Sequence, residues 1–150
     1  MRLSFSGSLE VSAPLAVVWQ RLTDPQFVAA AAPGVERVEQ VDASHFTVFS
    51  AVGLGAIRLP FTLEVELLEV IVLQRMTMRA QGSAPGAGVD LTKAIHLVEA
   101  AADQTTMNWQ SDCAVSGLLA GLGVHFLEGT ARKHTEKFWL DFATRCARAD

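Results

Sequence analysis

The sequence predicts an α+β fold in which seven antiparallel strands wrap around one long C-terminal helix. Apolar and polar residues alternate with a period of two over about eighty residues in the middle of the chain, as in strands with one buried face. Apolar residues near the C-terminus instead recur at helical spacing. Two short helical segments separate the first strand from the other six. With 150 residues, half of them apolar, we expect one domain, residues 1–150, with a single core.

The N-terminal segment begins with a half-buried strand over residues 2–11. Leu3, Phe5 and Val11 alternate there with polar residues, and Gly7 on the apolar side is expected to mark a bend or bulge. A helix is expected to follow, with Ser12 or Ala13 as its cap and proline in its first turn.

A second short helix is expected directly after the first. Asp24 precedes a proline and is the expected N-cap. Phe27, Val28 and the alanines up to Ala32 follow, and Pro33-Gly34 ends the helix. Because short alanine-rich helices have little packing mass, we expect this one to form the mouth or lid of any cavity.

The remaining strands follow one another with short connections, which favours an antiparallel meander. Glycine-rich residues 82–88 are expected to form a flexible loop, and residues 116–123 to lead into the final helix. The strands are expected at residues 35–41, 45–52, 57–67, 73–81, 89–98 and 105–115.

The final helix is expected over about residues 124–146. Leu127, Ala131, Phe138 and Phe142 fall on one face, and His134 lies in the middle of that face. At 1.5 Å per residue such a helix is roughly 30 Å long and crosses a small domain. The apolar face of the sheet is the surface available to it.

Composition and spacing argue against several functions. The net charge is −4 and the basic residues are dispersed, which argues against nucleic acid as a partner. The four histidines and two cysteines do not cluster at ligand spacing, so no metal or cofactor is expected, and Cys113 and Cys146 are expected to be free thiols. No signal peptide is apparent, and the most apolar stretch contains Arg58 and Pro60 and is too short to span a bilayer. We therefore expect a cytoplasmic protein.

Two stretches carry a resemblance to a known family. The segment FSGSLEVSAPLAVVWQRLTDPQFVAAAAPGVE, residues 5–36, and ARKHTEKFWLDFATR, residues 131–145, are similar to the CoxG family of carbon monoxide dehydrogenase proteins. That family is part of the START-like (Bet v 1-like, SRPBCC) superfamily. The resemblance covers nearly the whole chain and implies a helix-grip fold, in which a curved sheet holds the C-terminal helix.

The resemblance also implies a function. The superfamily has an apolar cavity between sheet and helix. Members of the family are encoded near molybdenum hydroxylases of the carbon monoxide dehydrogenase type. An accessory role is proposed for them, either recruitment of the enzyme to the inner face of the membrane or binding of a lipid-like or quinone molecule. The implied partners are thus a hydrophobic small molecule, that enzyme and a peripheral membrane contact.

Within this architecture the inward-facing residues line either a plain core or a cavity. His134 has three interpretations: an anchor in a buried hydrogen bond, a polar contact to a ligand carbonyl, or a catalytic group. We expect no catalytic residues. The candidate cavity residues are Phe27, Leu63, Val65, Met76, Met78, Leu91, Ile95, Trp109, Ser111, Leu127, Ala131, His134, Phe138 and Phe142.

Three functions remain open. The leading hypothesis is non-catalytic binding of an apolar small molecule, in an accessory role to a molybdenum hydroxylase. The first alternative is a polyketide cyclase or aromatase, in which His134 polarises a substrate carbonyl. It requires a further titratable group inside the cavity. The second alternative is a protein-interaction component whose interior is filled.

Overall fold

The computed structural model describes residues 1–32, 34–54, 57–117 and 120–148. Its elements follow the predicted order. They are β1 (Arg2–Val11), α1 (Leu15–Leu22), α2 (Pro25–Ala31), β2 (Val35–Asp42), β3 (His45–Leu54), β4 (Ile57–Ile71), β5 (Arg75–Ala84), β6 (Ala87–Ala101), β7 (Gln104–Gly117), the 3₁₀ turn η1 (Ala120–Leu122) and α3 (Val124–Arg148).

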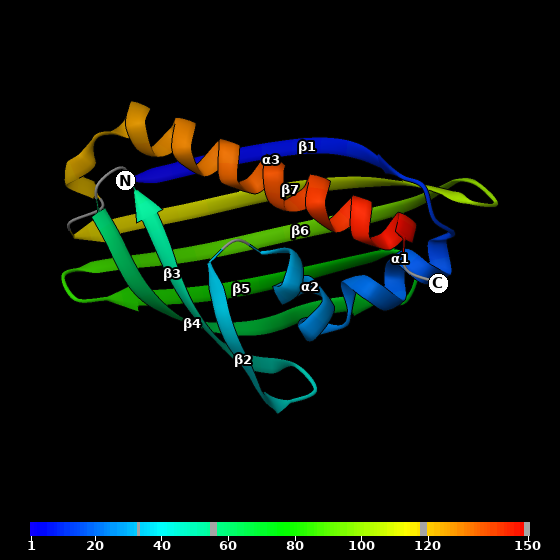
Figure 1. Ribbon diagram of the computed structural model, residues 1–150, viewed down its shortest axis with the longest axis horizontal. Coiled ribbons are helices and arrows are strands. Elements are labelled where there is room, and N and C mark those ends of the chain that lie inside the picture. Colours follow the sequence, from blue (N-terminus) through cyan, green and yellow to red (C-terminus); the bar gives the residue numbers. More distant parts are fainter. Residues whose placement is uncertain (33, 55–56, 118–119, 149–150) are drawn as a thin grey trace.

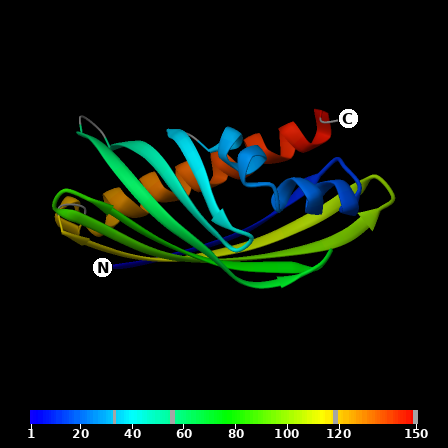
Figure 2. The same cartoon turned by 90° about the horizontal axis from the view of Figure 1, so that it is seen from below.

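The strands of the described residues form one antiparallel sheet of seven in the order β1-β7-β6-β5-β4-β3-β2. From β2 to β7 each strand pairs with the next in sequence, and β1 pairs with β7 at one edge. Figure 2 shows that the sheet is curved and that the helices lie on its concave side. The predicted α+β architecture is confirmed.

The long helix α3 does not cover the concave face evenly. It runs along the β1 and β7 side of the sheet, as Figure 1 shows, and contacts β1. Helix α1 contacts β6 and β7, whereas α2 contacts both α3 and β2. The tightly packed core therefore lies on one side of the concave face, and α2 bridges the other side.

The core gathers under α3 and α1. Phe142 of α3, Met107 of β7, Val11 of β1 and Val18 of α1 are fully buried in one cluster. Trp19 is also buried, which confirms its predicted role in anchoring α1 to the core. Burying a side chain of this size stabilises a fold by about 1.5–3 kcal/mol.

Gly7 has a different role from the one predicted. The pairing of β1 with β7 is regular through this position, so there is no bend or bulge here, and Gly7 pairs with Trp109. A Cβ atom at Gly7 would lie 2.7 Å from the Trp109 ring. The missing side chain thus makes room for the indole.

The helix starts are partly as predicted. Asp24 is the N-cap of α2, and its carboxylate accepts hydrogen bonds from the backbone amides of Gln26 and Phe27 at 3.1 and 3.4 Å. The cap of α1 is Pro14, so the expected cap at Ser12 or Ala13 is wrong. Pro33, expected at the end of α2, lies outside the described residues.

Several strands are longer than their patterns predict. The expected flexible loop at residues 82–88 is wrong, because β5 and β6 pair through this region and leave a two-residue turn at Pro85 and Gly86. Gly86 takes a positive φ of 75°, a conformation for which glycine is suited. The turn expected at residues 53–55 falls partly outside the described residues, as does the segment expected at residues 116–123.

The buried stripe of α3 is turned relative to the predicted face. Leu127, Trp139, Phe142 and Cys146 are buried, whereas His134 is exposed. The placement of His134 in the middle of the buried face is therefore wrong. The prediction missed Trp139, which is central to the true stripe.

Candidate ligand-binding cavity

A cavity of about 380 Å³ lies between the open half of the sheet and helices α2 and α3. Ligand pockets of proteins span roughly 300–1,000 Å³, so this volume suits a small organic molecule. The interpretation of a filled interior does not agree with this space. The lining residues are Leu22, Thr23, Pro25, Val28, Ala29, Ala32, Val35, Val38, Phe46, Val48, Ser50, Leu63, Val65, Leu67, Met76, Met78, Ala80, Leu91, Lys93, Ile95, His134, Thr135, Phe138 and Trp139.

The position of α3 explains why the cavity exists. The sheet is seven strands wide, and α3 covers the side formed by β1 and β7. The inward side chains of β3 to β6 therefore have no helix directly above them. Alanine-rich α2 spans the gap with small side chains at Ala29 and Ala32, which leave space beneath it.

The structure brings eight of the fourteen candidate residues together around this space. They come from β4, β5, β6 and α3, as the alternation and the helical spacing predict. These residues are Leu63, Val65, Met76, Met78, Leu91, Ile95, His134 and Phe138.

The other six candidates are not among the lining residues. Phe27 packs edge-on against the ring of Phe142, with ring centres 5.8 Å apart. Trp109 lies against Gly7, and Ser111 is buried on the same strand. Leu127 is buried in the core, and Ala131 packs against that core. These residues belong to the covered side of the sheet, which strand patterning cannot separate from the open side.

Several lining residues were not predicted. On β3, Phe46, Val48 and Ser50 face inward at alternate positions, and Val28, Ala29 and Ala32 of α2 line the mouth in place of Phe27. The most consequential omission is Lys93. Its position was readable, because it stands between Leu91 and Ile95 at the same parity in the alternating strand.

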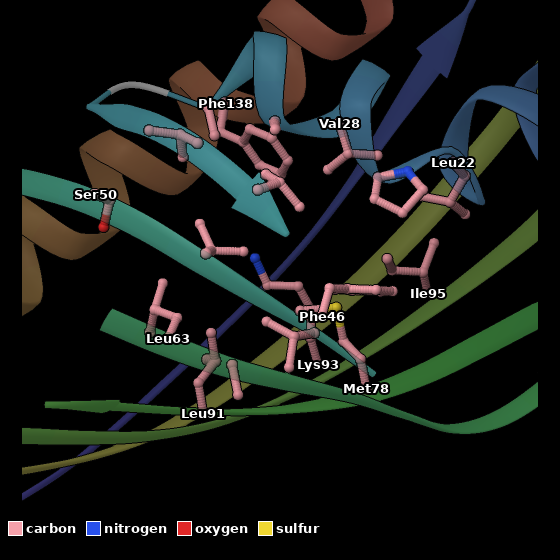
Figure 3. A pocket seen from close by; sticks show the side chains of 18 of the residues that line it. Leu22, Val28, Phe46, Ser50, Leu63, Met78, Leu91, Lys93, Ile95 and Phe138 are labelled. Atoms are coloured by element: carbon pink, nitrogen blue, oxygen red, sulfur yellow. The ribbon is translucent and has the colours of Figure 1, made fainter. Parts of the chain in front are cut away.

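Lys93 places an amine among apolar side chains. In β6 it pairs with Met78 of β5 on one side and with Ser111 of β7 on the other. Figure 3 shows its side chain reaching from the sheet into the cavity. Its Nζ lies 5.4 Å from the ring centre of Phe138 and 5.2 Å from that of Trp139, so two aromatic rings of α3 face the amine.

The surroundings of Lys93 disfavour its charge. The residue is partly buried and reachable from the cavity, but the amine is enclosed by protein, and this desolvation lowers the pKa of Lys93 from 10.5 to about 8. The nearby Cys113 thiol opposes that shift. Burial in turn raises the pKa of Cys113 itself, which keeps the thiol neutral.

Within the described part of the chain, no hydrogen-bond or ion-pair partner lies within reach of Lys93 Nζ. The acidic side chains that form ion pairs are exposed ones, such as Asp90, which binds Arg79 at 2.7 Å. The cavity lining contains neither aspartate nor glutamate. A buried charge normally has a partner.

A second polar group in the lining is also unpartnered. Trp139 is 2% exposed, and its indole Nε1 is buried without a hydrogen-bond acceptor among the described residues. Buried indole N–H groups usually find an acceptor. One cation and one neutral donor are thus presented by facing walls of the same cavity.

His134 lies at the edge of the cavity with its side chain exposed. The described residues provide it with no hydrogen-bond partner, so the interpretation as an anchor in a buried hydrogen bond is wrong. Its imidazole is free to contact a molecule at the cavity margin. Whether it does so stays a prediction.

Metal binding and membrane crossing find no support in the described residues. No group of three or more metal-ligating side chains gathers there. Cys146 is buried beneath α3, and desolvation raises the pKa of its thiol to about 11. None of the helices described is both long enough and apolar enough to cross a bilayer.

This architecture is the START-like, or Bet v 1-like, fold. A conserved protein from Geobacillus kaustophilus superposes with a TM-score of 0.90 at 18% identity, over 99% of this chain and 97% of that one. A START superfamily protein from Mycobacterium smegmatis gives 0.76 at 10% identity, over 98% and 99%. The Zhui aromatase/cyclase from Streptomyces sp. R1128 gives 0.74 at 17% identity, over 99% and 95%. These likenesses establish the fold.

Within this class the chain belongs to the CoxG family of carbon monoxide dehydrogenase proteins, whose model matches residues 7–147. The match includes nearly all of the two stretches that carry the resemblance in the sequence. Comparison with curated protein sequences gave no significant match.

Proposed function

We propose that the protein binds a hydrophobic small molecule in this cavity without transforming it. The observation that supports this most is the lining, in which about twenty side chains of mostly apolar character surround about 380 Å³ of space. Met76 and Met78 suit such a role because methionine adapts to irregular ligands. Membership of the CoxG family supports the same function.

Binding can be tested by reducing the cavity volume. Leu91→Trp adds a large side chain inside the cavity, whereas Val98→Trp adds the same side chain at an exposed position of the same strand. The neutral fluorescent probe N-phenylnaphthylamine should bind the wild-type protein and Val98→Trp, and bind Leu91→Trp at least about tenfold more weakly. Equal binding by all three proteins would contradict the proposed site.

The natural ligand is proposed to be lipid-like or quinone-like. The protein is further proposed to serve a molybdenum hydroxylase of the carbon monoxide dehydrogenase type, and to contact the membrane peripherally while doing so. Family membership supports this role. In a reconstituted system the protein should accelerate electron delivery from the hydroxylase to quinone-containing vesicles, and Leu91→Trp should not. An unchanged rate with either protein would contradict the accessory role.

A cyclase-type enzyme is the second candidate. It requires a titratable group in the cavity besides His134, and Lys93 is such a group. Both side chains can donate a hydrogen bond to a carbonyl oxygen and polarise it. The test is turnover of poly-β-keto model substrates by the wild-type protein, compared with Lys93→Met and His134→Gln. Catalysis lost in both variants would favour the enzyme, whereas binding without turnover favours the carrier.

A further inference from the structure

We propose that the ligand of this cavity carries one acidic group of the carboxylate type on an apolar body, and that the ammonium of Lys93 binds that group. The inference rests on the proposed function and names its ligand class. Two independent observations carry it: an amine enclosed in the cavity without a counterion among the described residues, and an indole N–H on the facing wall without an acceptor there.

The charge balance of the lining is the first step. Lys93 is the one lysine or arginine among the lining residues described, and no carboxylate balances it there. The rings of Phe138 and Trp139 attract the ammonium through cation–π contacts. Such contacts do not replace a hydrogen-bonded anion, and the cavity therefore favours a ligand that supplies one.

The other groups near the amine do not supply that anion. From β7, Cys113 keeps its proton because burial raises its pKa. Ser50 of β3 and Thr135 of α3 are neutral hydroxyls, and His134 of α3 is neutral or cationic. The counterion must therefore come from outside the described chain.

The Trp139 indole is the second step. A carboxylate accepts several hydrogen bonds at once, so it can use the ammonium and a neutral donor together. Trp139 lines the cavity and its ring faces Lys93 Nζ at 5.2 Å. A ligand that bore only hydrocarbon would leave both donors unpaired, which costs free energy.

The apolar neighbours fix the rest of the ligand. Leu91 and Ile95 flank Lys93 on β6, and Met78 lies beside it on β5, as Figure 3 shows. The acidic group would therefore sit between hydrocarbon surfaces. A monoanion with an apolar body satisfies this arrangement, whereas a dianion or a sugar phosphate would bring charge that the lining does not balance.

The experiment compares two ligands that differ in one group. Dodecanoate and dodecanol share an apolar chain, but only the first is anionic at neutral pH. Their affinities would be measured by calorimetry for the wild-type protein, for Lys93→Met and for Lys137→Met, which removes an exposed lysine paired with Asp141 on α3. The control thus loses the same charge away from the cavity.

The wild-type protein should bind dodecanoate about ten- to a hundredfold more tightly than dodecanol. Lys137→Met should keep this preference and Lys93→Met should lose it, while binding dodecanol as before. Absence of a preference in the wild-type protein, or its survival in Lys93→Met, would overturn the inference and leave apolar binding intact. Failure of the wild-type protein to bind either molecule would overturn the proposed function as well.

Proton uptake gives a second readout. The pKa of Lys93 in the free protein is about 8, and a bound carboxylate stabilises the protonated amine and raises that pKa. Near pH 8 the wild-type protein should therefore take up protons when dodecanoate binds, so that the binding enthalpy depends on the ionisation heat of the buffer. The same dependence in Lys93→Met would contradict the role of this amine.

Discussion

The amine of Lys93 lies 5.2 Å from the centre of the Trp139 ring, so β6 and α3 meet across the cavity through a cation and an aromatic face. Neither residue belongs to the set that sequence patterns assigned to the site. The contact shows that α3 does more than cover the sheet, because its buried stripe supplies one wall of the cavity. It also places the charged group of the lining where solvent is excluded.

Lys93→Met should stabilise the ligand-free protein. Methionine has similar length and no charge, so the variant removes an enclosed ammonium without leaving a large gap. The lowering of the Lys93 pKa from 10.5 to about 8 corresponds to roughly 3 kcal/mol as an upper limit. An increase of about 1–3 kcal/mol in the free energy of unfolding, measured with urea, is expected. A decrease would show that the amine has a stabilising partner in the fold.

The stabilisation should depend on pH in a defined direction. The folded-state pKa of Lys93, about 8, is below its unfolded value of 10.5, so the unfolded chain binds more protons between these values. The destabilisation is complete below about pH 8 and is relieved as pH rises toward 10.5. The difference between Lys93→Met and the wild-type protein should therefore shrink over this window. Using the difference cancels the thiols of Cys113 and Cys146, which are present in both proteins.

Two glycine substitutions should have opposite effects. Gly7→Ala places a methyl group 2.7 Å from the Trp109 ring and should lower the free energy of unfolding by about 1–3 kcal/mol. Gly129→Ala lies inside α3, where a Cβ meets no atom within 4 Å, and should raise it by about 0.5–1 kcal/mol. Thermal unfolding of both variants tests the pair. A neutral Gly7→Ala would refute the close packing of β1 on Trp109.

Removal of the α2 cap should loosen the mouth of the cavity. Asp24→Ala loses the acceptor for two backbone amides and should cost about 1 kcal/mol. Amide hydrogen exchange should become faster in α2, whose Val28 and Ala29 line the cavity, and remain unchanged in α3. Asp24→Asn is the control, because asparagine caps equally well. Equal exchange in both variants would mean that the cap does not hold α2.

The fold was predictable because its signals are local and repeated. Alternation along β4 to β7, the Asp24 cap and the helical spacing of the last segment each specify one element. Short connections then favour neighbouring antiparallel strands. The hairpin at Pro85 and Gly86 was missed because glycine-rich sequence also suits a loop, and cross-strand pairing decided between the two.

The site was only partly predictable, because it depends on where α3 lies across the sheet. Inward parity selects Leu91 and Trp109 alike, yet only Leu91 lies on the side that α3 leaves open. A small rotation of α3 buries Trp139 and exposes His134, and spacing alone does not fix that rotation. Lys93 was within reach of sequence reasoning: a lysine at an inward position of an apolar strand indicates a functional group.

The binding of an apolar molecule inside the cavity is tested most directly by the methionine methyl groups. Met76 and Met78 line the cavity, Met107 is fully buried in the core, and Met1 is exposed. The protein would be labelled with ¹³C-methyl methionine, assigned by single Met→Leu variants, and titrated with dodecanol. Saturable shifts of the Met76 and Met78 signals are predicted, with Met1 and Met107 unchanged. Shifts confined to Met1, or four unchanged signals at saturating probe, would contradict a ligand-binding cavity.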